Sequence, residues 1–562
     1  MKKKYIVLAI LLCSNFLINA QTSVYQKTYG GPDDDIGFSV IATADGGYAM
    51  TGSTKSFGAG DFDVLLVKLD ADANLQWSRV FGGTGTEEAI SLIQCNDGGY
   101  AICGKTSSYG QGSNDAMLIK TDSNGNLLQM KVYGGSNDER LLHIHQTNDN
   151  GLILSGSTAS YGQGNWDMMY IKTDSVGDTL WTKILGGTGY DQGTDAVQTN
   201  DGGYIISGRE QSWSAGYVDI FLAKLNANGD TLWTRAYGGA GWDEGMKVKQ
   251  TYDGGYIVTG GSTGFIDASY DAYLNKVDSD GHLTWSKLYS GLANDATYDV
   301  LQLEDSGYII MGITDSYGAN HQKQAHPATL HPSELFVSPP NHVLGSDNSN
   351  ILVIRTDPTG DTLWSRAYGG VLQDEGYAII QTLDKGFMID AYGKSFGTDS
   401  LDFYLIKTDS GGFSGCYEEP APVVIVSPPT VESATNMQIT SGVTVTDITN
   451  ALTVAVLTQN DICFATAINE ASSSQTTMTV YPNPFTSTAT IELPGEYNHF
   501  NHAQVKVYDV CGRELKNFTV YQNEKIQLNA KDFNPGIYFA NVIVTIDNEN
   551  REVALTAKFA VE

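Results

Sequence analysis

The triplet Tyr-Gly-Gly, or a close variant, recurs at intervals of 52 residues through most of this chain. The last interval is 79 residues, so 27 extra residues stand in the sixth unit. A fixed period of this length indicates stacked supersecondary units, each of which needs its neighbours to bury its core. The seven copies are Tyr29-Gly30-Gly31, Phe81-Gly82-Gly83, Tyr133-Gly134-Gly135, Leu185-Gly186-Gly187, Tyr237-Gly238-Gly239, Tyr289-Ser290-Gly291 and Tyr368-Gly369-Gly370.

Each unit predicts four short strands. Residues 38–43 form the first, and the turn after it, Asp45-Gly46-Gly47, has the residues that hairpin turns with positive φ require. The third strand, residues 63–70, holds four successive apolar residues, which indicates burial on both faces. Four strands in a unit of this length are typical of a β-propeller blade. We expect the tryptophans of the fourth strand to pack between units: Trp77, Trp181, Trp233, Trp285 and Trp364.

The two ends of the array complement each other. The seventh unit has its first three strands, but Phe413-Ser414-Gly415-Cys416 stands where the fourth should be. Residues 24–29, ahead of the first unit, have the pattern of a fourth strand without a unit of its own. Pairing the two completes seven blades and removes both exposed edges. We therefore predict an all-β fold, with a seven-bladed β-propeller of four-stranded blades over residues 21–416 and an insertion at about 319–348 in blade six.

The repeat resembles a family of known repeats. An aromatic-Gly-Gly triplet, an Asp-Gly turn and Asp-x-x-x-x-Lys follow one another in this order, as in the β-propeller repeats of many exported bacterial proteins. The resemblance implies the fold and no particular activity.

Composition and the N-terminus indicate export. A formal net charge of −31 excludes nucleic acid and anionic membrane as expected partners, because nothing basic offsets their charge. Residues 1–20 are typical of a secretory signal peptide, with three lysines, an apolar stretch and a cleavage site after Ala20. A lipoprotein signal at Cys13 is the alternative. No later stretch is apolar for long enough to span a bilayer. Cys416 and Cys463 are disulfide candidates, and Cys95 with Cys103 is a second possible pair.

The C-terminal part changes character twice. Residues 417–477 are rich in Pro and Thr and predict a linker or a small β segment. Residues 478–562 contain a series of short motifs: Tyr481-Pro482-Asn483-Pro484, Val507-Tyr508-Asp509, Gly512-Arg513, Gly536-Ile537-Tyr538 and Lys558-Phe559. In these motifs the segment resembles the type A C-terminal sorting domain of the type IX secretion system of Bacteroidetes. The resemblance implies a small β-sandwich, the type IX machinery as partner, and a location outside the cell or on the outer-membrane surface.

Two sets of carboxylates recur on one face of the predicted ring. We call it the top face; it carries the loops from strand four to the next strand one and from strand two to strand three. One interpretation is a calcium site or an acid–base pair. The other is a framework role, accepting backbone N–H groups and pairing with the recurrent cation of strand three. We favour the framework, because a role repeated seven times is structural, and we expect no cofactor, with calcium as the open alternative. The sets are Asp35, Glu87, Glu139, Asp191, Asp243, Asp295 and Asp374, and Asp63, Asp115, Asp167, Asp219, Asp271 and Asp402.

Departures from the repeat are better candidates for function. Trp166, Tyr190 and Trp242 fall outside the recurrent aromatic positions and are expected on the top face, where aromatic faces stack on sugar rings. The insertion contributes four histidines as weak metal candidates, whose spacing matches no defined zinc site: His321, His326, His331 and His342.

These patterns together favour a non-catalytic binding or adhesion module for a glycan or a surface protein. An enzyme acting on extracellular polysaccharide is the first alternative, although the chain shows no nucleophile motif. A passive surface scaffold is the second.

Overall fold

The computed structural model describes most of residues 23–561, and residues 1–20, expected to be a signal peptide, and the insertion lie outside the described residues. The gaps are 215–216, 264, 266–268, 319–347, 397–399, 435–437, 441–443, 449–451, 454–457, 467–478, 482–484, 494–501, 510–513, 522–524, 534–535 and 547–550. Among the described residues, no helix has the length and hydropathy needed to cross a membrane.

The repeats form antiparallel sheets, numbered here by chain order, and each has five strands. Sheet 1 contains β2 (Asp35–Ala42), β3 (Tyr48–Thr54), β4 (Asp63–Leu69), β5 (Leu75–Phe81) and β34 (Leu452–Thr453). Sheet 2 contains β6 (Glu87–Gln94), β7 (Tyr100–Thr106), β8 (Asp115–Thr121), β9 (Leu127–Gly134) and β33 (Thr444–Ile448). Sheet 3 contains β10 (Glu139–Gln146), β11 (Leu152–Thr158), β12 (Asp167–Thr173), β13 (Thr179–Gly186) and β32 (Gln438–Thr440). Sheet 4 contains β14 (Asp191–Gln198), β15 (Tyr204–Glu210), β16 (Asp219–Leu225), β17 (Thr231–Gly238) and β31 (Val431–Ala434).

The remaining repeat sheets follow the same plan. Sheet 5 contains β18 (Asp243–Gln250), β19 (Tyr256–Thr263), β20 (Tyr270–Val277), β21 (Leu283–Ser290) and β30 (Val424–Val426). Sheet 6 contains β22 (Asp295–Gln302), β23 (Tyr308–Thr314), β24 (Asn350–Thr356), β25 (Thr362–Tyr368) and β29 (Glu418–Pro420). Sheet 7 contains β26 (Asp374–Gln381), β27 (Phe387–Gly393), β28 (Asp402–Thr408), β1 (Ser23–Gly30) and β35 (Thr458–Thr466).

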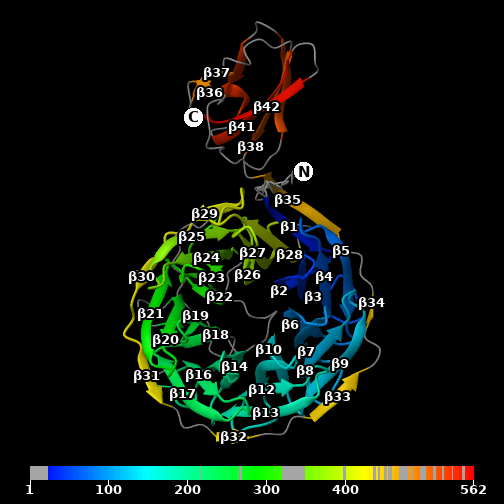
Figure 1. The fold of residues 1–562 in the computed structure, drawn as a ribbon, viewed down its shortest axis with the longest axis vertical. Helices are drawn as coiled ribbons and strands as arrows, with labels where there is room; N and C mark the ends of the chain where they lie inside the picture. Colours follow the sequence, from blue (N-terminus) through cyan, green and yellow to red (C-terminus); the bar gives the residue numbers. More distant parts are fainter. Residues whose placement is uncertain are drawn as a thin grey trace, which may run out of the picture.

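These sheets follow one another around a propeller-like ring, with the first strand of each repeat innermost (Figure 1). Sheet 7 contacts sheet 1, so the ring is closed. The closing strand is β1, which pairs with β28 between Tyr25↔Lys407 and Tyr29↔Phe403. The expected pairing of the N-terminal strand with the last repeat is confirmed.

The segment after the repeats is the main difference from expectation. Strands β29 to β35 do not form a separate linker or β segment but run around the outside of the ring, the yellow to orange strands of Figure 1. We call residues 418–466 the belt. Its successive strands pair with the outermost repeat strand of sheets 6, 5, 4, 3, 2, 1 and 7. Outer edges with unpaired N–H and C=O groups recruit short strands rich in Thr and Val, which explains this use of the segment.

The Gly-Gly triplet has a physical reason in this fold. A Cβ on the first glycine would collide with the third-strand Asp, for instance 1.7 Å from Asp63 Oδ1 at Gly82. The second glycine donates its N–H to the carboxylate four residues later, at 2.6 Å from Gly31 to Asp35. The same bond recurs in the other six repeats at 2.6–2.8 Å. The carboxylates at this position therefore hold the loop between consecutive repeats.

Side chains of the repeat also join adjacent sheets. The triplet tyrosine donates its hydroxyl to a carbonyl of the next sheet, as from Tyr29 to Ala73 at 2.6 Å and from Tyr368 to Gly412 at 2.5 Å. Each fourth-strand tryptophan packs on an aromatic ring of the next sheet, with Trp77 and Tyr100 centroids 5.9 Å apart. The third-strand cation pairs with the Asp-Gly turn rather than with the top-face carboxylates, as Lys172 does with Asp149 at 3.0 Å.

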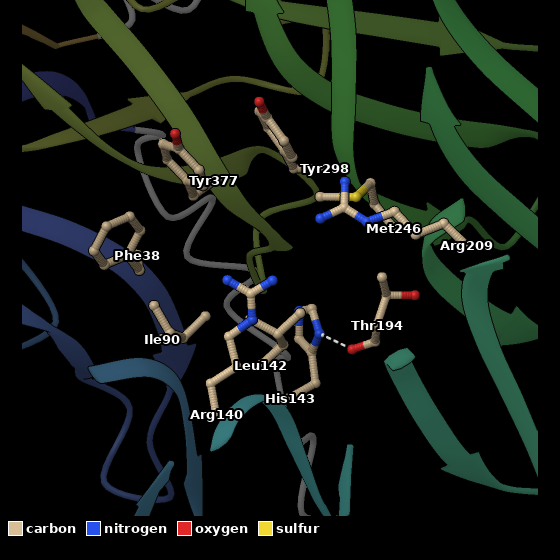
Figure 2. A pocket seen from close by; sticks show the side chains of 10 residues that line it. All are labelled: Phe38, Ile90, Arg140, Leu142, His143, Thr194, Arg209, Met246, Tyr298 and Tyr377. Atoms are coloured by element: carbon tan, nitrogen blue, oxygen red, sulfur yellow. Dashed lines mark hydrogen bonds between the residues drawn. The ribbon is translucent and has the colours of Figure 1, made fainter. Parts of the chain in front are cut away.

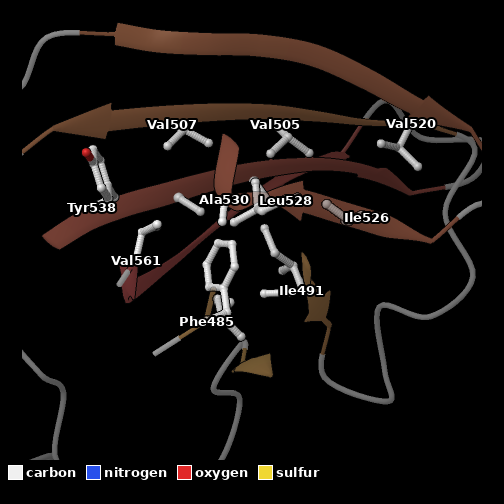
Figure 3. Packing of buried hydrophobic residues seen from close by; sticks show 14 of the residues in the cluster. Phe485, Ile491, Val505, Val507, Val520, Ile526, Leu528, Ala530, Tyr538 and Val561 are labelled. Atoms are coloured by element: carbon white, nitrogen blue, oxygen red, sulfur yellow. The ribbon is translucent and has the colours of Figure 1, made fainter. Parts of the chain in front are cut away.

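The C-terminal residues form two small sheets. One contains β36 (Thr479–Tyr481), β37 (Thr488–Glu492) and β40 (Ile526–Asn529), followed by the 3-10 helix η2 (Ala530–Asp532). The other contains β38 (His502–Asp509), β39 (Glu514–Tyr521), β41 (Gly536–Ile546) and β42 (Arg551–Val561). Residues of both sheets share one apolar core, to which Phe485, Ile491, Val505 and Leu528 belong (Figure 3).

The cysteines divide into two groups. Cys416 is disulfide-bonded. Cys463 stands opposite Gln26 in the β35–β1 ladder, and the Gln26 side chain donates to the Cys416 carbonyl, so the backbone brings both cysteines to one place. The Cys416–Cys463 pairing stays a prediction that this register favours. The second expected pair is wrong, because Cys95 and Cys103 are both buried free thiols.

Replacing Gly82 by Ala tests the role of the triplet. The new Cβ would lie 1.7 Å from Asp63 Oδ1, and we expect the overpacked site to lower the free energy of unfolding by about 2–4 kcal/mol. Gly46→Ala is the control, since Gly46 has φ +84° and open space around a Cβ, so that only a backbone cost of about 1 kcal/mol arises. Equal losses in thermal unfolding would contradict the steric account.

The disulfide of Cys416 should fasten the belt to the ring. We expect Cys416→Ser to destabilise the protein by about 2–4 kcal/mol, and reductant to lower the melting temperature of the unmodified chain similarly. Cys95→Ala, which changes a free thiol, should keep the full response to reductant. A melting temperature indifferent to reductant would contradict this role.

Candidate functional site

The innermost strands share a β-bulge that re-aims one side chain in each repeat. In every inner strand the register to the second strand shifts around one residue, seen for example between Gly37 and Ser39. The bulged residues line one cavity together with Arg140, His143 and Arg209, so that all seven repeat sheets contribute (Figure 2). The bulged set is Phe38, Ile90, Leu142, Thr194, Met246, Tyr298 and Tyr377.

One side of the cavity, from sheets 6, 7 and 1, is aromatic. The rings of Tyr298 and Tyr377 stack with centroids 4.8 Å apart and planes 15° from parallel. Tyr392 also stacks on Tyr377, with ring centroids 5.5 Å apart, and Phe38 meets Tyr377 edge-on at 5.1 Å. The Tyr377 hydroxyl donates to Glu375 at 3.0 Å, which holds the ring in place.

The opposite side, from sheets 3 and 4, is polar and cationic. Arg140 and Arg209 are 3% and 2% exposed, and both guanidinium groups extend into the cavity in Figure 2. Arg209 pairs with Glu244 at 2.8 Å and donates from Nε to Gln192 at 2.8 Å. The Arg140 guanidinium lies over the Trp166 ring, 5.1 Å from its centroid. The pKa of Arg140 is lowered to about 9, mainly by burial and secondly by the charge on Arg209.

A histidine completes the polar side. His143 Nδ1 lies 2.7 Å from the Thr194 carbonyl, the dashed line in Figure 2. Burial lowers the pKa of His143 to about 3, so its ring is neutral at physiological pH. Beside it, His145 Nε2 lies 2.9 Å from Asp195 Oδ1. Burial raises the pKa of Asp195, but the charge of Lys247 and the hydrogen bond with His145 outweigh it and leave that pKa well below the usual value.

A second, polar groove opens on the top face. It lies over sheets 7, 1 and 2, and its lining includes Phe62, the lysines Lys55 and Lys105, and the carboxylates Asp34, Asp61 and Glu88. Lys105 pairs with Glu88 at 3.1 Å, and Lys55 lies 4.4 Å from the centroid of the Phe62 ring. Burial raises the pKa of Glu88 to about 7 against the opposing charges of Lys105 and Arg140. Glu88 of the groove and Arg140 of the cavity therefore lie close enough for their charges to interact.

The three aromatics singled out from the sequence stand behind the cavity rather than as an exposed platform. Trp242 is only 8% exposed and packs in one cluster with Val218 and Tyr298, which corrects the expectation of an open aromatic face. Trp166 and Tyr190 are half-buried, and a parallel β-bridge joins them. Trp166 supports Arg140, so it is a positioning residue for the cavity.

The bulged residues were missed in the sequence. Their signal was present, because one register of the repeat holds Phe, Ile, Leu, Thr, Met and Tyr while its flanking positions stay strand-like. Alternation alone cannot show that an extra residue turns this register away from the sheet faces toward the axis of the ring.

The structure supports the framework interpretation for the first set of top-face carboxylates, each of which accepts the N–H group of the second triplet glycine. Glu87, for example, accepts from Gly83 N–H at 2.6 Å and Thr106 Oγ1 at 2.7 Å. No cluster of three or more metal-ligating side chains occurs in the part of the chain that the structure describes. The four histidines of the insertion lie outside that part, and calcium stays an untested alternative.

The C-terminal sheets are similar to a known family. Residues 479–561 match the family model "Secretion system C-terminal sorting domain". The chain carries a type IX secretion sorting domain. It is therefore a protein sorted by type IX secretion, secreted or attached at the outer-membrane surface, and the sorting domain implies interaction with that machinery.

Larger parts of the chain are similar to one sequence relative and to two solved structures. Regulatory protein FlaEY of Caulobacter vibrioides is 24% identical over 384 residues. The match covers 58% of this chain and only 38% of that relative. The crystal structure of Sqt1 from Chaetomium thermophilum matches 69% of this chain and 99% of its own at 12% identity and a TM-score of 0.37. The extracellular domain of BT3049 from B. thetaiotaomicron matches 93% and 68% at 11% identity and a TM-score of 0.27. At these TM-scores neither structure carries an argument about fold or function.

Buried carboxylates with raised pKa values predict a pH dependence of stability. Burial raises the pKa of Glu210 to about 8, with Asp191 and Asp219 adding to it, and burial raises that of Asp295 to about 8. The unfolded chain loses these protons near pH 4–4.5, so the folded state loses stability as pH rises from there to about 8. Burial acts to raise the pKa of Asp149, but hydrogen bonds to its carboxylate outweigh this effect and lower the pKa to about 2. Acid below pH 4 therefore destabilises the fold as well.

We therefore expect the melting temperature to be highest at mildly acidic pH. Glu210→Gln removes one of these ionisations and should reduce the loss of melting temperature between pH 5 and 8. Glu304→Gln changes an exposed glutamate and should keep the slope of the unmodified protein. Parallel curves for Glu210→Gln and the unmodified chain would contradict the assignment.

Proposed function

We propose that the chain is an exported, non-catalytic glycan-binding module. Residues 1–20 direct export, the repeats form a seven-bladed β-propeller completed by β1, and the sorting domain is a β-sandwich. The ligand site is the cavity at the axis of the ring together with the adjoining top-face groove.

The observation that supports this proposal is the asymmetry of the cavity. The frame of the ring repeats seven times, whereas the bulged position differs from sheet to sheet. A cavity walled by stacked tyrosines on one side and hydrogen-bonding groups on the other suits a sugar, which has an apolar ring face and polar substituents. The groove beside it, with Lys55, Phe62 and Lys105, offers the same combination to further sugar units of a chain.

The alternatives fit these residues less well. The top-face carboxylates that an enzyme would use are engaged in holding loops, as Asp35 is by Gly31 and Ser56. A passive scaffold gives no reason for the differences among the bulged residues.

Binding to immobilised polysaccharides and oligosaccharides tests the proposal on the chain without its signal sequence. We expect at least one glycan class to bind, and Tyr377→Leu to weaken it by about tenfold through loss of ring stacking. Tyr252→Leu is the matched control, since Tyr252 is 68% exposed in a turn outside the cavity, and should bind as the unmodified protein does.

The opposite results are equally informative. A folded protein that binds no glycan would overturn the proposal and leave a protein ligand or a scaffold role. Binding that Tyr377→Leu leaves intact would place the site elsewhere. Release of new reducing ends from a polysaccharide would favour the enzymatic alternative.

A further inference from the structure

The two walls of the cavity differ in charge as well as in shape. Arg140 and Arg209 come from neighbouring sheets, extend into one space, and lie close enough for the Arg209 charge to disfavour the charge on Arg140. Each has contacts of its own, Arg209 with Glu244 and Arg140 with Trp166, so both are fixed in position before any ligand enters. The aromatic wall across the cavity is formed by Tyr298, Tyr377 and Phe38.

Two guanidinium groups converge in this buried site, and Glu244 and Glu88 offset part of their charge from behind. A carboxylate accepts paired hydrogen bonds from a guanidinium, and the interaction gains strength where water is excluded. A neutral hydroxyl accepts weaker hydrogen bonds and does not reduce the repulsion between the two arginines. The cationic wall therefore favours an anionic group over a neutral one.

The dimensions of the cavity limit what carries the charge. The cavity has a volume of about 80 Å³, and one water molecule needs roughly 10–15 Å³ of such space. The space thus holds several waters or a single small ring. A ring on the Tyr298–Tyr377 wall would turn its substituents toward the arginines on the other side.

We propose that the cavity recognises a carboxylate borne on a six-membered ring, and specifically a uronic acid residue of an acidic glycan. The carboxylate would accept hydrogen bonds from Arg140 and Arg209, and the apolar face of the sugar would lie against Tyr298 and Tyr377. Neighbouring sugars would extend into the groove past Glu88 and Lys105. This inference rests on the proposed glycan-binding function and names the class of sugar.

The test compares probes of equal shape and different charge on the chain without its signal sequence. Calorimetric titration would use oligogalacturonate, the same oligosaccharide with its carboxylates methyl-esterified, a neutral galactose oligomer, and benzoate. We expect oligogalacturonate to bind at least about 30-fold more tightly than its methyl ester, because charge-assisted hydrogen bonds are roughly twice as strong as those between neutral groups.

Variants of one arginine locate the effect. Arg140→Gln should remove most of the preference for the acid, and Arg140→Lys should keep part of it, since a lysine keeps the charge and loses the planar fork. Arg79→Gln is the matched control, because Arg79 lies over Trp77 at the same 5.1 Å but outside the cavity, and should leave binding unchanged. Circular dichroism and melting curves confirm that each variant is folded, and the comparison of probes on the unmodified protein needs no variant.

The outcomes separate the two proposals. Equal affinity for the acid and its ester overturns the uronic acid inference and leaves the glycan-binding function standing. Binding of benzoate without any sugar keeps recognition of a ring-borne carboxylate and overturns the glycan function. No binding of any probe overturns the inference, and the wider polysaccharide panel then decides the function.

Discussion

The hydrogen bond from the second glycine of each triplet to the carboxylate four residues later is the contact on which the ring depends. It fixes the loop that leads from one sheet to the next, at 2.6–2.8 Å in every repeat. In five of the triplets the preceding glycine leaves room for the third-strand Asp, as Gly82 does for Asp63. Since most charged side chains of the repeat are committed to such contacts, the frame has little chemistry left to offer. Function has to come from positions where the repeats differ.

Much of this could be predicted from the sequence, because the relevant signals are local. The spacing of Asp45-Gly46-Gly47 and its equivalents gives the strands and their number in each repeat, and the missing fourth strand of the last repeat predicts its replacement by residues 24–29. The belt could not be predicted, because the strand pattern of residues 418–466 is weak and their partners lie up to several hundred residues away. A short strand takes its register from the edge it joins rather than from its own sequence.

The candidate site was predictable only in outline. The site expected at Trp166, Tyr190 and Trp242 is close to the cavity, yet Trp242 is buried and Trp166 serves to hold Arg140. The cavity itself depends on a bulge, which changes the direction of one side chain without changing the hydrophobic pattern. Arg140 and Arg209 occupy strands of two neighbouring sheets, and the packing of these sheets brings their guanidinium groups into one space.

The belt has a consequence for the time course of folding. Ser23 pairs with Thr466, so the first described strand of the ring is covered by the last strand of the belt. Loop-closure entropy grows only slowly with chain length, so this contact costs little in stability, but pairings between distant segments form slowly. The outer edges of all seven sheets stay available to other chains until the residues just ahead of the sorting domain have folded onto them. Completion of the belt therefore replaces the long outer edge strand of sheets 1 to 6 by a shorter one, and a short edge strand offers less backbone for another chain to pair with.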